Sequence, residues 1–391
     1  PNLDMDLVVE GDAIRLARRL ARRVGARTRS HRRFGTAKII LEDRETEFGV
    51  PSLDFATARL EFYAHSAALP EVERSSIKAD LHRRDFTINT LAIRLDSGHY
   101  GQLLDFYGGE QDLYEGKIRA LHSLSLIEDP TRIMRAARFE QRLGFVIEAR
   151  TEELIDNALP MLARVSGERI RHELYLILRE REPERALCRL DELHVLAQIH
   201  PRLACLDETW ERFAALRQAI GAGWKAVLQG SVFVEDGQPS PSLYLALLTH
   251  DLSRPEGEAL ASRLKIFRDD LTLLHQVLDL REQEAQLDQP VLSNREIYAL
   301  LRYSSTPALL VVWLCTDSAR VRERVWRYET ELRHIQPVVD GTYLKSLGLK
   351  PSPLFSQLLH AVRDARLDGQ VRSEEEEKAL IASLLAEREE G

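Results

Sequence analysis

The chain has 391 residues, a length that suits two to four domains rather than a single core. Hydrophobic residues make up 44% and charged residues 30%, and no apolar stretch reaches 18 residues, which excludes a membrane-spanning helix. The first residues show no signal peptide, so we expect a cytoplasmic protein. The formal net charge of −8 argues against a nucleic-acid binder, but residues 1–50 and 301–350 each carry a net charge of +3, so local basic surfaces are expected.

The first part of the chain alternates strand and helix patterns. Residues 4–9 have the pattern of a buried strand, and Asp12 and Gly25 are suited to begin and end the helix that follows. Further strands are predicted at 34–41 and 53–60, a helix at 75–83, and a strand pair within 91–106. These elements form a small α+β unit of roughly 120 residues, and we expect its first strand to lie upstream of residue 1.

From residue 125 onward the strand patterns nearly vanish. Asp129 and Pro130 are suited to begin a helix that Gly144 ends, because Asp caps helices and Pro fits their first turn. Helical periodicity continues at 152–162, 167–180 and 183–197 and, with interruptions, to the end of the chain. We therefore predict an all-α region of roughly 270 residues after the α+β unit.

Two aspartates begin the first predicted strand. Asp4 and Asp6 are two residues apart, which places their side chains on one face of the strand, about 7 Å apart. Asp54 lies on a neighbouring predicted strand, with Leu53 and Phe55 facing the other way. Carboxylate oxygens are the ligands that Mg²⁺ prefers, and a cluster of acids is costly without a cation. The pattern therefore indicates a Mg²⁺ site at Asp4 and Asp6 with Asp54 as a third acid; the alternative is three surface charges.

Two arginine-rich segments carry groups that are suited to a nucleotide. The sequence RRDFTIN places Arg84, Asp85 and Asn89 close together. Guanidinium groups bind phosphate oxygens bidentately, and carboxylate and amide groups bind hydroxyls such as those of ribose. Arg132 and Arg135 are three residues apart on the predicted helix after Pro130, so they share one helix face. The alternative for this row is a solvent-facing surface.

The order of these segments resembles one family. The DxD pair, LDFATAR, RRDFTIN, EDPTRIMRAARF and SGERIRHEL resemble the motifs of the class II tRNA nucleotidyltransferase/poly(A) polymerase family. LHRRDFTIN and HSLSLIEDPTRIMRAARF are most like the long bacterial A-adding form. The resemblance is dense over residues 3–185 and returns at 341–369. The GGxVRD turn of the family, which holds the triphosphate, is expected upstream of Asp4 and is absent from this sequence.

The resemblance implies a fold and an activity. It implies an α+β nucleotidyltransferase head with a small antiparallel-type sheet over residues 1–120, an all-α neck with nucleotide-selecting helices over 121–200, a helical body over 201–335, and a helical tail that docks tRNA over 336–391. The implied activity is addition of AMP, or of CMP and AMP, to the 3′ end of tRNA. The 3′-hydroxyl would attack the α-phosphate of ATP with Mg²⁺ as the cofactor, and CTP is left open as a second nucleotide.

The resemblance also implies roles for individual residues. Asp4 and Asp6 would bind the metal, and Asp54 would be the third catalytic acid. The nucleotide would be bound by Arg84, Asp85, Asn89, Asp129, Arg132 and Arg135. Within that set Asp129 and Arg132 would select the base, and Glu168 and Arg169 would support the neck helices.

Alternatives to this function stay open. One is a poly(A) polymerase, and another is a non-catalytic RNA-binding remnant that lacks the upstream phosphate turn. A third, an HD-type phosphohydrolase, rests on His250 and Asp251, but a metal site needs further His and Asp ligands, and the sequence offers no convincing set. We expect the basic segment at 320–333 to contact tRNA together with the tail, and we expect Trp326 to pack in a core.

Overall fold

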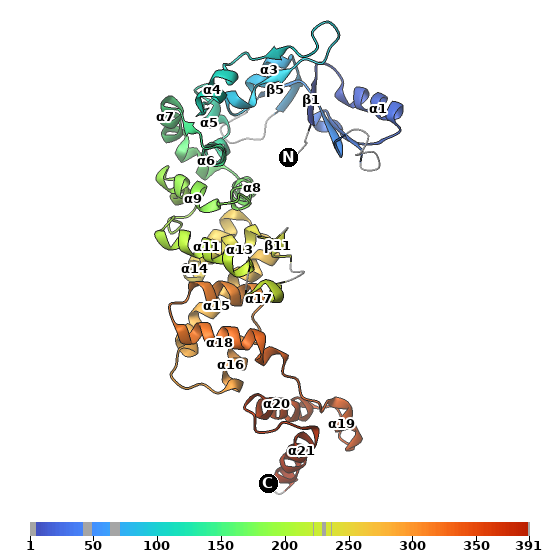
Figure 1. The fold of residues 1–391 in the computed structure, drawn as a ribbon, viewed down its shortest axis with the longest axis vertical. Coiled ribbons are helices and arrows are strands. Elements are labelled where there is room, and N and C mark those ends of the chain that lie inside the picture. Colours follow the sequence, from blue (N-terminus) through green and yellow to red (C-terminus); the bar gives the residue numbers. More distant parts are fainter. Residues whose placement is uncertain are drawn as a thin grey trace. The chain divides into compact units, whose positions relative to one another are not determined.

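The computed structural model describes residues 5–41, 49–62, 71–221, 223–228, 232–235 and 237–389. The chain divides into two units, residues 1–204 and 205–391 (Figure 1). Unit 1 contains, in chain order, β1 (Met5–Val9), α1 (Ala13–Val24), β2 (Arg27–His31), η1 (Arg32–Phe34), β3 (Thr36–Ile40), β4 (Ser52–Thr57), β5 (Arg59–Phe62), β6 (Glu71–Arg74), α3 (Ile77–His82), η3 (Thr87–Asn89), β7 (Ala92–Ile93), β8 (Leu103–Leu104), α4 (Gly109–Glu115), β9 (Lys117–Ile118), α5 (Ser125–Glu128), α6 (Thr131–Leu143), β10 (Val146–Ile147), α7 (Ala149–Ala158), η4 (Leu159–Arg164), α8 (Gly167–Leu178), α9 (Pro183–Glu192) and α10 (Val195–Ile199).

The central sheet of unit 1 has the strand order β1-β4-β3-β2. β1 and β4 are parallel, whereas β4 with β3 and β3 with β2 are antiparallel. Helix α1 packs against β2, β3 and β4, and it buries Ala13, Ala17 and Ala21 in one core cluster with Ile39 and Phe55. Alanines at every fourth position form one face of the helix, and their small side chains let it lie close to the sheet. The opposite face of the sheet is left without this helix.

The two best predicted helices both form, although α6 begins one residue later than predicted, with Pro130 at its N-cap position. The Asp12 carboxylate accepts a hydrogen bond from the first turn of α1, and Gly25 ends that helix with φ of 68°. At the start of α6 the Asp129 carboxylate accepts the backbone N–H of Thr131 at 3.0 Å, and Gly144 ends the helix with φ of 67°. Both helices are therefore confirmed.

The α+β head and the helical region are confirmed, but the sheet is mixed rather than antiparallel-type, because β4 returns parallel to β1. The single strand predicted at 53–60 is two strands that meet at the buried Ala58. Ala58 donates its N–H to Val9, and its carbonyl accepts from Ser75, so the chain leaves the sheet there to pair with β6. Alternation along β1 predicts that Met5 faces the core with Leu7 and Val9, but Met5 is 47% exposed.

The second half of unit 1 is helical. In α6 the side chains of Ile133 and Met134 are fully buried, and so are Ile170 and Leu174 in α8, against which α6 packs. Helix α6 also packs against α9. The motif residues of α6 are thus held on a helix whose apolar positions are buried among neighbouring helices.

Unit 2 is formed almost entirely of helices in its described residues. Its elements are α11 (Asp207–Gly221), α12 (Lys225–Leu228), β11 (Val234–Glu235), β12 (Gln238–Pro239), α13 (Pro241–Thr249), α14 (Arg254–Leu264), α15 (Arg268–Leu287), α16 (Asn294–Leu301), α17 (Thr306–Cys315), α18 (Ala319–Thr330), η5 (Leu332–His334), α19 (Gly341–Ser346), α20 (Pro353–Leu367) and α21 (Glu374–Glu389). Helix α17 packs against α15, α13 and α18 and is the apolar centre of this unit.

Over the described ranges, no single helix is long and apolar enough to cross a membrane. One pair, α16 with α17, reaches the required length and composition together, but the two helices are bent by 110°.

Candidate functional site

A row of charged side chains crosses the face of the sheet opposite α1. Asp6 on β1 is in register with Asp54 on β4, Asp54 with Lys38 on β3, and Lys38 with Arg29 on β2. Residues directly opposite each other on paired strands share a face and have Cβ atoms about 4.5–5.5 Å apart. The two carboxylates predicted on separate strands are therefore neighbours, with Leu7 and the other alternate residues facing α1.

The carboxylates on this face are accessible. Asp6 is exposed, and the Asp54 side chain is 33% exposed and forms an ion pair with Lys38 at 2.9 Å. Asp4 lies outside the described residues. Among the residues that are described, no group of three His, Cys, Asp or Glu side chains is placed to hold a metal ion. Asp6 and Asp54 fit Mg²⁺ as a pair of hard oxygen donors, since Mg²⁺ commonly takes one or two carboxylates and fills its shell with water and substrate phosphates.

The predicted RRDFTIN segment is fixed by a carboxylate that the sequence reasoning missed. Asp80, which is fully buried, accepts hydrogen bonds from the side chain of Arg83 at 3.0 and 3.1 Å, and it lies 3.8 Å from Arg84. Glu61 holds Arg83 from the other side at 3.1 Å. The spacing of Asp80 three and four residues before two arginines was the available signal, because such pairs meet on a helix surface.

Asp85 and Asn89 form a closed turn after this arginine pair. One oxygen of the Asp85 carboxylate accepts both its neighbour's backbone N–H and the Asn89 amide, each at 2.9 Å. Arg84 donates to the Asn89 carbonyl at 3.1 Å. The three predicted residues are thus brought together, and the Arg84 side chain remains 31% exposed for a further ligand.

Helix α6 brings Asp129 and Arg135 to the same place. Arg135 donates to the second oxygen of Asp85 at 3.0 Å, and it lies 3.4 Å from Asp129 and 3.3 Å from Glu173. Asp129 also accepts from Arg169 at 2.6 Å, which is the support that we expected from Arg169. We call these five residues, Asp85, Asp129, Arg135, Arg169 and Glu173, the neck cluster.

Burial and charge oppose each other in the neck cluster. Burial by itself lowers the pKa of Arg135, but the carboxylates of Asp85, Glu173 and Asp129 outweigh burial and raise that pKa above its usual value. Burial raises the pKa of Glu173, and Arg135 opposes that shift. Arg135 therefore stays charged, and it is the cation on which three carboxylates converge.

Arg132 is buried, with 4% of its surface exposed, and joins the helical region to the head. Its guanidinium donates to the Ser125 hydroxyl at 2.5 Å and to the Arg83 carbonyl at 2.6 Å. Its Nε has no hydrogen-bond acceptor within the described part of the chain. Arg132 is thus held by Ser125 and Arg83, and one of its buried donors has no acceptor among the described residues.

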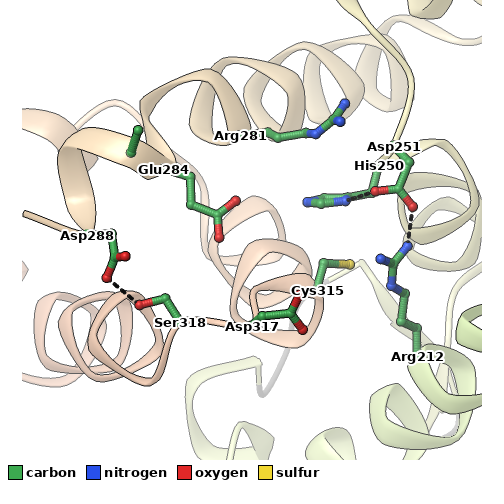
Figure 2. A pocket seen from close by; sticks show the side chains of 10 residues that line it. Arg212, His250, Asp251, Arg281, Glu284, Asp288, Cys315, Asp317 and Ser318 are labelled. Atoms are coloured by element: carbon green, nitrogen blue, oxygen red, sulfur yellow. Dashed lines mark hydrogen bonds and ion pairs between the residues drawn. The ribbon is translucent and has the colours of Figure 1, made fainter.

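The His250-Asp251 pair lies in a pocket of unit 2 with a volume of about 640 Å³ (Figure 2). His250 is 4% exposed and its Nδ1 lies 3.0 Å from Asp251, which also accepts from Arg212 at 2.5 Å. Cys315 and Glu284 line the same pocket, but none of the described residues forms a metal-binding group there. The pair is part of an ion-paired chain that needs no metal, and the structure adds no support to the phosphohydrolase alternative.

The arginines of the basic segment at 320–333 mostly form hydrogen bonds and ion pairs with other residues of unit 2. Four of its arginines contact backbone carbonyls or carboxylates of the same unit, the exposed Arg320 and the more buried Arg322, Arg324 and Arg333. Trp326 packs against the buried Trp224 with ring centroids 5.4 Å apart but is itself only partly buried, so it lies at the edge of a core rather than inside one. These four guanidiniums are occupied, so the predicted tRNA contact in this region depends on the tail and stays a prediction.

A small mixed sheet with acids on its uncovered face, joined by an arginine-rich turn to a helical neck, defines the nucleotidyltransferase class of fold. Comparisons with known proteins agree with this class. Residues 1–119 match the poly A polymerase head domain, and residues 144–206 match the probable RNA and SrmB-binding site of polymerase A.

Relatives extend the likeness beyond the head. The A-adding tRNA nucleotidyltransferase of Geobacter sulfurreducens is 40% identical to this chain, over 98% of this chain and 43% of its own length. The A-adding tRNA nucleotidyltransferase of Halalkalibacterium halodurans is 30% identical, over 96% of this chain and 83% of its own length. A solved apo structure of a CCA-adding enzyme is 32% identical, with a TM-score of 0.78 over 99% of this chain and 88% of that one. The chain belongs to the class II tRNA nucleotidyltransferase/poly(A) polymerase family, and it spans less than half the length of the Geobacter relative.

Proposed function

We propose that this protein adds AMP to the 3′ end of tRNA, with addition of CMP before AMP as the alternative for the same site. The observation that carries the proposal is the register of Asp6 with Asp54 on the face of the sheet opposite α1, in the same head as the arginine-rich turn. The names of the relatives support AMP as the nucleotide and tRNA as the acceptor. This substrate is in keeping with a cytoplasmic enzyme.

The carboxylates have a direct role in the proposed reaction. Asp6 and Asp54, with Asp4 as a further ligand, would hold Mg²⁺, which supplies activation of the 3′-hydroxyl and neutralises charge on the departing pyrophosphate. The chain's own contribution is positioning and electrostatics, because phosphoryl and nucleotidyl transfer need little further covalent chemistry from the protein. Arg84 would contact the phosphates, since its partly exposed side chain lies beside the closed turn of Asp85 and Asn89, which is suited to bind the ribose.

The neck would select the base. Arg132 has one buried donor without an acceptor in the described residues, and the Asp129 Oδ2 atom has only a 3.4 Å contact to Arg135. A donor and an acceptor in this arrangement fit the pairing edges of adenine and cytosine, which each offer an amino donor beside a ring acceptor. Guanine and uracil would leave these groups unpaired. Arg135 would hold Asp129 in position.

The test measures incorporation of one labelled nucleotide at a time into tRNAs that end before C, after C, after CC and after CCA. We expect AMP addition to the CC end, and Asp6→Ala should lower its rate by at least about 10²-fold. Asp96→Ala is the matched control, because Asp96 is an exposed carboxylate of the same head whose ion-pair partners among the described residues, Arg94 and His99, belong to its own turn.

The outcomes separate the alternatives. Repeated AMP addition beyond one residue would indicate a poly(A) polymerase instead. Binding of tRNA without incorporation by the full-length wild-type protein would indicate the RNA-binding remnant. Retained turnover in Asp6→Ala at saturating Mg²⁺ would contradict the role of the sheet carboxylates.

A further inference from the structure

One continuous part of the head carries a strong positive charge. Residues 13–41 contain nine arginines and one lysine and no aspartate or glutamate. The net charge of the whole chain is −8, so the other residues together carry −18. This segment forms α1, β2, the turn η1 and β3, which are adjacent in the structure (Figure 1). We call the nine arginines of residues 15–33 the arginine surface.

The arginines of α1 point away from the core. The helix turns its alanines toward the sheet, and Arg15, Arg19 and Arg22 on the other side are exposed. Within the described residues none of the nine arginines has a carboxylate at ion-pair distance, and Arg18 donates only to the Ser30 hydroxyl. Like charges four residues apart repel on a helix, so this arrangement is unfavourable without an anionic partner.

Strand β2 extends this surface to the face that carries the carboxylates. Arg29 is in register with Lys38 and, through it, with Asp54, so Arg29 lies on the same face as the candidate metal site. Two β-strand spacings, each about 4.8 Å, separate the backbone of β2 from that of β4. The surface therefore reaches from the outer side of α1, around the edge strand, to the catalytic face.

The turn after β2 adds an aromatic ring. Phe34 is 47% exposed, and the Arg33 guanidinium lies 5.7 Å from its ring centre. Exposed aromatic rings beside guanidinium groups bind stacked bases in proteins that hold single-stranded nucleic acid. A row of guanidiniums without carboxylate partners among the described residues, with one ring at its edge, fits a phosphodiester chain better than it fits an isolated anion.

We propose that the arginine surface binds the phosphate backbone of the RNA substrate, as a contact of the head that is separate from the neck and the tail. The choice of RNA rests on the proposed function, since tRNA is the polyanion that function supplies. Among the described residues these guanidiniums have no carboxylate partner, which distinguishes this segment from Arg322 and Arg324 of α18, whose guanidiniums donate to carbonyls of unit 2. The surface guides the RNA strand across the edge β2 toward Asp54.

The experiment compares two triple variants of the full-length protein. Arg15→Gln/Arg19→Gln/Arg22→Gln removes three charges from α1 and keeps good helix formers there. The control, Arg74→Gln/Lys78→Gln/Lys117→Gln, removes three charges from accessible cations elsewhere in the head. Binding of a tRNA transcript ending in CC is measured by fluorescence anisotropy between 50 and 200 mM salt, and AMP incorporation is measured at saturating tRNA.

We expect the α1 variant to bind tRNA about tenfold more weakly and to lower the log–log salt slope by about two units, because each lost phosphate contact lowers that slope by nearly one. The control should keep both values, and the α1 variant should keep its rate at saturating tRNA. It should also be at least as stable as the wild type in low salt, because repulsion on α1 is removed.

Three results would overturn the proposal. An unchanged tRNA affinity and slope would exclude RNA, and binding of phosphatidylserine vesicles that only the α1 variant loses would assign the surface to a membrane instead. An equal loss in both triple variants would show a general effect of charge. If the wild type binds tRNA through this surface but incorporates no AMP, the proposed function fails and this inference stands.

Discussion

The open sheet face and the neck cluster use the same kinds of residue in opposite ways. On the sheet, Asp6 is exposed and Asp54 has Lys38 as its charged neighbour. In the neck, Asp129 has 10% of its side chain exposed and is contacted by two arginines, one of which also pairs with Asp85 and Glu173. The sheet carboxylates are accessible to a ligand, whereas the neck carboxylates are paired with arginines and leave mainly the Oδ2 atom of Asp129 for a further contact.

This difference separates two physical tasks. Exposed carboxylates lose little free energy when they exchange water for a cation, so they can bind and release it in each turnover. Buried charges are costly unless they are paired, and removing one partner leaves the others uncompensated. The neck cluster thus gives Arg84, Asp85 and Asn89 a fixed geometry, because Arg135 ties the turn that contains Asp85 to helix α6. Changes in the neck should therefore affect stability first, and changes on the sheet should affect activity first.

The largest expected effect is the loss of Arg135. Arg135→Ala should lower the free energy of unfolding by about 2–4 kcal/mol. This value is smaller than that of a fully buried ion pair, because 29% of the Arg135 side chain is exposed. The substitution leaves Asp85, Asp129 and Glu173 without their shared cation. The measurement is urea unfolding of the wild type and the variant, monitored by circular dichroism.

Arg142→Ala is the control on the same helix. Its side chain is 57% exposed and lies 3.9 Å from Glu180, so the expected change is at most about 0.5 kcal/mol. If both variants lose the same free energy of unfolding, the stability does not come from the neck cluster in particular.

The sequence predicts the secondary structure of the two regions better than it predicts which residues meet in them. Spacing alone places Asp6 and Asp54 on separate strands, and the helix signals at Asp129 and Gly144 are strong because capping is local chemistry. The parallel pairing that makes Asp6 and Asp54 neighbours is a long-range contact, and periodicity carries no information about which strands pair.

The partners of the neck residues show the same limit. Arg135 reaches Asp85, which is 50 residues away in sequence, and Arg169 reaches Asp129 across 40 residues. Residue types and spacing marked these positions as charged and helical, but not as buried. Strand β2 escaped prediction for a related reason, since its polar sequence becomes a strand only through pairing with β3.

The second effect concerns base selection in the neck. Arg132→Ala should relax the preference for ATP over GTP and UTP by about 10- to 10²-fold, because an unpaired buried polar group costs roughly 1–3 kcal/mol. Asp129→Ala should do the same if both residues read the base. The measurement is incorporation of each nucleotide into a tRNA ending in CC, with thermal unfolding of each variant as the control. Loss of stability with full discrimination would assign both residues to the structure alone.

A smaller effect should appear in the acid range. Burial, followed by the nearby His82 and Arg132, lowers the pKa of His122 from 6.5 to about 4. Because the pKa of His122 is lower in the folded chain, the unfolded chain binds the proton more tightly. The contribution of the neutral His122 to folding stability is therefore complete above pH 6.5 and is lost as the pH falls toward 4. His122 is only partly buried, so the loss should be about 1–2 kcal/mol after allowance for solvent.

The test of this pH dependence is urea unfolding at pH 7 and pH 5. The wild type should lose stability between the two values, and His122→Gln should lose less. His99→Gln is the control, because His99 lies on an exposed turn beside Asp96 with 54% of its side chain accessible. If the wild type and His122→Gln lose the same free energy of unfolding between pH 7 and pH 5, a residue other than His122 causes the pH dependence.

The smallest expected effect returns to the sheet. Lys38→Met removes the cation beside Asp54, and its side chain and that of Asp54 are 45% and 33% exposed. Exposed ion pairs contribute about 0–1 kcal/mol, so the free energy of unfolding should change by no more than this. Urea unfolding of Lys38→Met beside Arg135→Ala measures the contrast directly. The same loss in both would mean that the sheet face is held together by its charges, as the neck is, and that Asp54 is not free to serve a ligand.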